Sequence, residues 1–249
     1  MADVHEIAEG IFRIASYNEQ AGLAFTQFLI RDEQPLLFHT GQRGIFQDTL
    51  AAVRTLIEPA TLRYVSWSHW EGDESGALND FLGVAPAAEP VHGAVGARLN
   101  VKEWAIRPAR IVADGELLPL GSHRLRFLMT PQVPHAWDAL MAYEETTGTL
   151  FVSDLFVQFG DRTPATSTDI VGPSIDSFRR IPEAYPVGPR MIATFDRLLA
   201  TRPRTLAVMH GPTYTGDAAA AALRDLRDGM VAATDWSGLR DASSGMLVV

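Results

Sequence analysis

Hydrophobic and polar positions alternate along the first forty residues in the manner of a β-meander. Residues 11–16, Ile-Phe-Arg-Ile-Ala-Ser, alternate as a half-buried strand does. Residues 23–30 and 35–38 predict two further strands, and the polar turn between them, residues 31–34, predicts a hairpin. The chain is therefore expected to begin with an antiparallel sheet.

The spacing becomes helical after residue 41. Apolar side chains recur at positions 46, 50, 53, 56 and 57, and Pro59 closes the pattern. Residues 64–68 predict a short strand. Helical spacing resumes over residues 75–82, with Ser75 as the expected N-cap.

The second half repeats the order of strands followed by a helix. Short strands are predicted over residues 110–113, 115–118, 123–129, 140–143, 149–153 and 206–209, and helices over 191–200 and 218–227. Residues 157–190 contain five prolines and many Ser and Thr, which predicts a long connection or lid. One domain, residues 1–249, is the expectation for this length.

Composition restricts the classes of function. With 47% hydrophobic and 20% charged residues, the chain is of the globular type. A net charge of -9 argues against a nucleic-acid partner. Zero cysteines exclude disulfides, thiolate metal sites and cysteine-held iron–sulfur clusters, and fit a cytoplasmic location. No signal peptide or run long enough to span a membrane is recognisable.

The stretch from residue 65 to 78 contains three side chains that can bind metal within five positions. His69, Glu71 and Asp73 stand at alternate positions. In an extended strand His69 and Asp73 would lie about 13 Å apart, at roughly 3.3 Å per residue. Bonds of about 2 Å cannot bridge that gap at one ion. Either the loop curls, which Gly72 permits, or the residues serve two neighbouring ions.

Three more candidate ligands follow predicted strands. His135 comes after residues 123–129, Asp154 after 149–153 and His210 after 206–209, as His69 follows 64–68. We expect side chains at such strand ends to converge at one edge of a layered protein.

The ordered set His69-x-Glu71-x-Asp73, His135, Asp154 and His210 resembles the metallo-β-lactamase superfamily, and within it the di-iron domain of flavodiiron proteins and related oxygen-binding di-iron proteins. The resemblance implies an α/β fold, an αββα sandwich of two mixed β-sheets flanked by helices. It also implies that His69, Glu71 and His135 bind one iron, that Asp73 and His210 bind the other, and that Asp154 bridges them.

Glu71 is the discriminating position. Hydrolases of this fold typically place histidine there, whereas the di-iron branch reads His-x-Glu-x-Asp, as this chain does. The three carboxylates favour an oxidisable pair of iron ions with an oxo or hydroxo bridge over zinc, the alternative metal.

Other residues near the ligands are candidates for contacts around them, namely Glu74, His39, Trp70 and Tyr214. Glu74 stands where the resemblance most often has histidine, and it could bind the second metal, hydrogen-bond to a ligand or face water.

The leading expectation is a non-haem di-iron oxidoreductase that binds and reduces O2 or NO. The chain shows no Gly-rich phosphate loop for a flavin, so electrons would come from a separate redox protein. An oxygen sensor acting on a signalling partner is a second form of the same hypothesis. The alternative is a dinuclear hydrolase of a thioester, lactone or phosphodiester. The resemblance further implies a homodimer.

Overall fold

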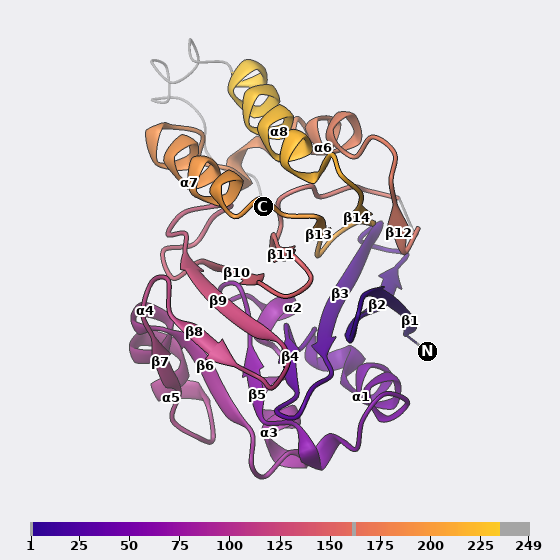
Figure 1. Ribbon diagram of the computed structural model, residues 1–249, viewed down its shortest axis with the longest axis vertical. Coiled ribbons are helices and arrows are strands. Elements are labelled where there is room, and N and C mark those ends of the chain that lie inside the picture. The colour runs from indigo at the N-terminus through magenta and orange to yellow at the C-terminus, as the bar shows by residue number, and fades with distance from the viewer. Residues whose placement is uncertain (1, 161–162, 235–249) are drawn as a thin grey trace.

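Two β-sheets lie face to face between two layers of helices, as Figure 1 shows. The computed structural model describes residues 2–160 and 163–234. Within these ranges the predicted αββα sandwich of two mixed sheets is confirmed. The last fifteen positions of the predicted domain 1–249 lie outside the described residues.

The first sheet contains seven strands in chain order. Their bounds are β1 Asp3–Ala8, β2 Ile11–Asn18, β3 Leu23–Ile30, β4 Leu36–Phe38, β5 Tyr64–Ser66, β6 Glu89–Gly93 and β7 Arg110–Val112. Strands β1 to β4 are antiparallel, and the predicted hairpin of β3 and β4 is confirmed. Strands β4 to β7 are parallel, because long connections carry the chain back to the same end each time.

The second sheet has the order β12-β14-β13-β11-β10-β9-β8. The bounds are β8 Leu117–Pro119, β9 Arg124–Met129, β10 Leu140–Glu144, β11 Thr149–Phe151, β12 Ala165–Thr166, β13 Thr205–Ala207 and β14 Thr213–Thr215. The pairs β11–β13 and β12–β14 are parallel and the others antiparallel.

Helices cover the outer faces of both sheets (Figure 1). The helices of the described residues are α1 Phe46–Arg54, α2 Gly72–Ser75, α3 Leu78–Val84, α4 Ala94–Gly96, α5 Lys102–Trp104, α6 Val171–Phe178, α7 Pro189–Ala200 and α8 Ala219–Ala233. The short helix α2 lies in the middle of the molecule rather than on an outer face (Figure 1). Short 3₁₀ turns are η1 Arg43–Ile45, η2 Pro59–Thr61 and η4 Pro182–Ala184, and a π turn, η3 Ala97–Val101, joins α4 to α5.

Alternation along the strands divides the apolar side chains into three layers. In β3, Phe28 and Ile30 point between the sheets, whereas Leu29 packs against the layer of α1 and α3. In β10, Leu140 points between the sheets and Met141 packs beneath α6, α7 and α8. Strands buried on both faces are apolar at nearly every position, which fixes the sandwich and the placement of the loops at its edge.

One helix was not predicted, and one predicted N-cap was wrong. The long connection predicted over residues 157–190 contains α6, which buries Ile175 and Phe178 at helical spacing. Pro173 is compatible with this helix since it lies in the first turn, where a backbone N–H has no partner within the helix. Ser75 does not cap a helix over 75–82. It ends α2, and its hydroxyl donates to the carbonyl of Glu71 at 2.8 Å.

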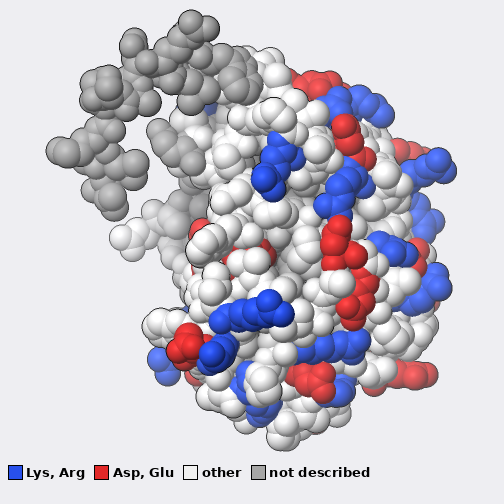
Figure 2. Space-filling view, turned by 90° about the vertical axis from the view of Figure 1, so that its left-hand side faces the viewer, with Lys and Arg blue, Asp and Glu red and all other residues white. Residues whose placement is uncertain are grey.

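On the face of the described chain seen in Figure 2, basic and acidic side chains are interspersed, mostly over its right-hand and lower parts. The prediction that no nucleic acid binds is compatible with this mixture and stays a prediction. Among residues 2–160 and 163–234, no helix has the length and apolar character needed to cross a lipid bilayer.

Candidate metal centre

The six predicted ligands follow the ends of four strands. His69 follows β5, His135 lies between β9 and β10, and Asp154 and His210 follow β11 and β13. Glu71 directly precedes α2, and Asp73 lies within that helix. The expected convergence is confirmed, because the side chains of all six fall into overlapping groups of close carboxylate and imidazole atoms.

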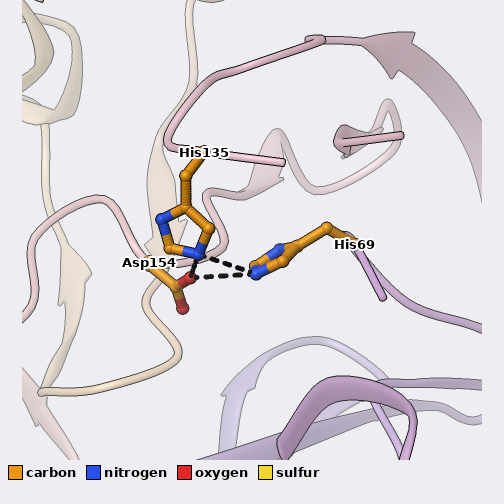
Figure 3. A group of neighbouring side chains, drawn as sticks. All are labelled: His69, His135 and Asp154. Atoms are coloured by element: carbon orange, nitrogen blue, oxygen red, sulfur yellow. Dashed lines mark hydrogen bonds and ion pairs between the residues drawn. The ribbon is translucent and has the colours of Figure 1, made fainter. Parts of the chain in front are cut away.

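The first group brings together His69, His135 and Asp154, shown in Figure 3. The two Nε2 atoms lie 2.9 Å apart. Asp154 Oδ2 lies 3.4 Å from Nε2 of His69 and 3.2 Å from Nε2 of His135. Three atoms with lone pairs thus face one point between β5, β9 and β11.

Glu71 closes this group on its outer side. Its Oε1 lies 3.2 Å from Nε2 of His135 and 3.6 Å from Nε2 of His69. The loop curls to bring it there, since the N–H of Glu71 donates to the carbonyl of His69 at 3.1 Å and α2 begins at Gly72. Hydrogen bonds with His135 and His69 lower the pKa of Glu71 to about 2.

The second group faces the other oxygen of Asp154. Nε2 of His210 lies 3.3 Å from Asp154 Oδ1 and 3.3 Å from Asp73 Oδ2. Asp73 is therefore paired with His210. The loop curls, as the first sequence alternative expected, and His69 and Asp73 face different groups, which is compatible with the second. Asp154 turns one oxygen to each group.

These separations fit coordination of two ions. Atoms bound to one ion at about 2.0–2.2 Å lie about 3.0–3.5 Å apart in tetrahedral or octahedral geometry. The Asp154 contacts to His69, His135 and His210 span 3.2–3.4 Å. Oxygen and imidazole ligands suit iron, zinc and other divalent metals.

Backbone carbonyls orient two of the imidazoles. Nδ1 of His135 donates to the carbonyl of Ala184 at 2.9 Å, and Nδ1 of His210 donates to that of Ala24 at 2.8 Å. A carbonyl only accepts hydrogen bonds, so in each neutral ring Nε2 carries the lone pair and faces the carboxylates. This arrangement is typical of histidines that bind metal through Nε2.

The carboxylates and imidazoles of the two groups shift each other's pKa values. Burial alone would lower the pKa of His210, but the carboxylates of Asp154 and Asp73 outweigh burial and raise that pKa to about 10. Burial opposes ionisation of Asp154 too, yet His210, His69 and His135 hold its pKa well below the usual range. Metal binding would displace the proton of His210, because an imidazole binds metal only in its neutral form.

Glu74 lies inside the cluster rather than at the surface. Its side chain is 1% exposed, so of the three roles left open by the sequence the water-facing one is wrong. Its Oε1 lies 3.8 Å from Nε2 of His69. It also groups with Asp73 and His210. Burial and the nearby charges of Asp154 and Asp73 raise the pKa of Glu74 well above its ordinary value.

His39 contacts the cluster indirectly. Its Nε2 lies 3.0 Å from the hydroxyl of Ser68, which lies 3.0 Å from Nδ1 of His69. Ser153 donates to the same hydroxyl at 2.9 Å. His39 thus supports the orientation of His69, as a residue near the ligands is expected to do.

The two aromatic residues predicted to lie near the ligands, Trp70 and Tyr214, differ in their distance from the site. Trp70 packs edge-on against Trp67 and lines, with Glu71 and Trp104, a cleft of about 340 Å³ beside the first group. Tyr214 belongs to the apolar cluster beneath α6 to α8. Among the contacts of the described chain, none joins Tyr214 to the six residues.

Sequence reasoning missed three residues that support the site. Ser68 and Ser153 orient His69, and the hydroxyl of Tyr185 donates to the carbonyl of Asp154 at 3.0 Å. Ser68 and Ser153 each precede a candidate ligand, which was a usable signal. Tyr185 gave none, because it lies 31 positions from its partner, in the stretch predicted to be a long connection or lid.

The fold and these residues define a metallo-β-lactamase-like protein with metal-ligand groups at the strand ends. The model of the family described as "ODP family beta lactamase" matches residues 23–183. The chain therefore belongs to the ODP family of β-lactamase-like domains.

Curated relatives match only part of their own length. A putative diflavin flavoprotein A 1 of Nostoc sp. is 35% identical over 138 residues, which cover 54% of this chain and 24% of that protein. An anaerobic nitric oxide reductase flavorubredoxin of Salmonella arizonae is 27% identical over 154 residues, covering 59% of this chain and 31% of that protein. The chain thus aligns with a quarter to a third of these relatives.

Solved structures share the fold. Rubredoxin oxygen:oxidoreductase of Desulfovibrio gigas superposes with a TM-score of 0.81 at 18% identity, over 91% of this chain and 61% of that one. The fragment 1–254 of a putative diflavin flavoprotein A 5 from Nostoc sp. superposes with a TM-score of 0.79 at 18% identity, over 93% of this chain and 96% of that fragment. The resemblance to the β-lactamase-like part of flavodiiron proteins is thereby confirmed.

Proposed function

We propose that this chain is a non-haem di-iron protein that binds O2 or NO and reduces it with electrons from a separate redox protein. The observation that carries the proposal is the position of Asp154, whose Oδ2 faces His69 and His135 while Oδ1 faces His210. A carboxylate so placed can hold two metal ions at a fixed spacing. All six predicted ligands have roles in this arrangement, as the resemblance implies.

The donor set favours iron over zinc. Glu71, Asp73 and Asp154 contribute three negative charges, which stabilise an oxidised metal pair better than neutral imidazoles would. Glu71 is the key member, because it stands where hydrolases of this fold have histidine. Bound iron would supply redox chemistry that zinc, which has no accessible second oxidation state, does not.

The names of the relatives agree with this function. Those relatives include an anaerobic nitric oxide reductase and a rubredoxin oxygen:oxidoreductase. The whole proteins are longer than the aligned region, so their activities are proposals for this chain. Its organisation as one domain over residues 1–249 and its assembly as a homodimer are proposals too.

In this proposal, the residues of the chain would bind the two metal ions, orient the ligands around them and limit the access of water to them. His69 and Asp154 are buried, and their imidazole and carboxylate are held by Ser68 and by the neighbouring histidines. The Glu71 side chain is 50% exposed beside the cleft lined by Trp70 and Trp104. A diatomic gas is small enough to reach the centre from this side, and a redox protein could approach there.

Metal analysis followed by gas titration tests the proposal. Protein produced without added zinc should retain two iron ions per chain. After anaerobic reduction, O2 or NO should change its visible absorption in proportion to the iron content. With a chemical reductant in excess, wild-type protein should consume gas, and Asp154→Ala should not. An Asp114→Ala variant, which removes a surface carboxylate paired with Arg197, is the matched control.

Two results would lead to other functions. A protein that holds only zinc and hydrolyses thioesters, lactones or phosphodiesters would support the hydrolase alternative. Tight O2 binding with a stable oxidised form and no repeated turnover would support an oxygen sensor.

A further inference from the structure

We propose that Glu74 supplies a fourth protein ligand to the ion that Asp73 and His210 would hold. This assignment rests on the proposed di-iron function and adds a residue that the resemblance did not assign. It follows from burial, from missing hydrogen bonds and from a count of ligands at the two positions.

The carboxylate of Glu74 is buried beside the carboxylate of Asp73, a neighbour of like charge. The side chain is 1% exposed, and within the described chain neither Oε1 nor Oε2 has a hydrogen-bond partner. The backbone of Glu74 is satisfied separately, since its carbonyl accepts from the N–H of Thr40 at 2.7 Å. A buried carboxylate with no partner is costly, so it signals a role that a cation would complete.

The carboxylate points into the cluster. One of its oxygens lies within coordinating reach of a carboxylate oxygen of Asp73 and an imidazole nitrogen of His210. Glu74 also forms a group with His69 and Glu71. Its Oε1 lies 3.8 Å from Nε2 of His69, a longer contact than those joining the first group. Glu74 follows Asp73 in α2, and of these two residues only Glu74 is fully buried.

The two positions have unequal numbers of ligands without Glu74. The first is faced by His69, Glu71, His135 and one oxygen of Asp154. The second is faced only by Asp73, His210 and the other oxygen of Asp154. A ligand from Glu74 makes both positions four-coordinate in protein atoms. With four carboxylates, the set would also balance the charge of two divalent ions.

The alternative role is that of a protonated acid that donates a hydrogen bond to Asp73. The substitution Glu74→Gln separates the two roles. Glutamine keeps the shape and can still donate to Asp73, but it offers no anionic oxygen. Thermal midpoints would be measured by circular dichroism for chelator-stripped and Fe(II)-loaded protein under anaerobic conditions. Fe(II) titration would give the affinities of the two ions.

We expect Glu74→Gln to melt at a higher temperature than wild type when stripped of metal, because a neutral amide replaces a buried carboxyl that is crowded by the carboxylates of Asp73 and Asp154. Fe(II) should then stabilise the variant less than it stabilises wild type. The second ion should bind at least about tenfold more weakly, and the first ion should bind as in wild type.

Glu144→Gln is the matched control. Glu144 is also buried, but it accepts hydrogen bonds from Thr146 and Thr147 outside the cluster. This variant should melt lower without metal and bind two Fe(II) ions normally.

The outcomes separate the two proposals. If wild type and Glu74→Gln both bind two ions equally tightly, only the assignment of Glu74 is overturned. If stripped Glu74→Gln melts lower than stripped wild type and both affinities fall together, Glu74 is a structural residue. If wild type itself does not hold two ions, the proposed di-iron function fails, and the Glu74 assignment fails with it.

Discussion

Nδ1 of His210 lies 2.8 Å from the backbone carbonyl oxygen of Ala24, a residue 186 positions earlier in the chain. Ala24 is in β3 of the first sheet, whereas His210 follows β13 of the second. The contact therefore spans the sandwich. It orients a side chain of one sheet through the main chain of the other, and it leaves Nε2 free to face Asp73 and Asp154.

His210→Ala should remove the ion held at the second position and spare the first. The reason is that His69, Glu71 and His135 do not depend on His210 for their mutual contacts. Iron analysis should find the content reduced by half relative to wild type. Complete loss of iron from a folded variant would contradict the independence of the two groups.

Glu71→His should shift metal preference from iron towards zinc. The change replaces an anionic oxygen by a neutral imidazole and so weakens the stabilisation of oxidised iron. We expect iron retention to fall by roughly tenfold in competition with zinc, read from metal content after growth with both metals. Glu89→His, at a partly exposed salt bridge with Arg63, should leave the ratio unchanged. Equal iron loading in both variants would contradict the idea that the anionic oxygen of Glu71 makes the site prefer iron.

His39 should affect metal affinity without touching the metal. It has φ of 67°, a left-handed conformation that asparagine tolerates better than most residues, so His39→Asn keeps the backbone while losing the contact to Ser68. We expect the affinity of the first ion to fall by about 10- to 100-fold, with little change in the second. Isothermal titration with Fe(II) or Zn(II) checks this. An unchanged affinity would show that Ser153 alone orients Ser68.

Glu144 should make stability depend on acid pH. Burial alone would raise the pKa of Glu144, but hydrogen bonds from Thr147 and Thr146 outweigh it and hold the pKa below 4.5. A carboxylate with a lowered folded-state pKa stabilises the fold above its unfolded-state value. That stability is lost as the pH falls from 4.5 through the lowered pKa.

Urea unfolding at pH 7 and at acid pH measures this effect. Glu144→Gln should cost about 1–3 kcal/mol at pH 7 and should reduce the loss of stability on acidification. The same acid sensitivity in both proteins would assign it to other carboxylates.

The local pattern of apolar and polar residues was sufficient to predict most strands. The metal-capable side chains that follow those strands were sufficient to predict a metal site. Residues 23–30 form β3 over the predicted range, because alternating large apolar side chains there are buried on both faces. Helix α6 was missed since the prolines around it dominate the local signal. The hydrogen bonds that orient the ligands join residues far apart in sequence, such as His135 and Ala184, and leave no periodic trace.

Apolar periodicity predicted most strands and helices, and the resemblance carried by the six ordered metal-capable side chains implied the αββα fold. Periodicity and residue type are local properties, so they can be read from the chain. The packing of the folded chain was needed to show that Asp154 faces both groups, that Asp73 pairs with His210 and that Glu74 is buried among them. Those relations depend on the packing of two sheets, which brings loops from opposite halves of the chain to within a few ångströms of each other.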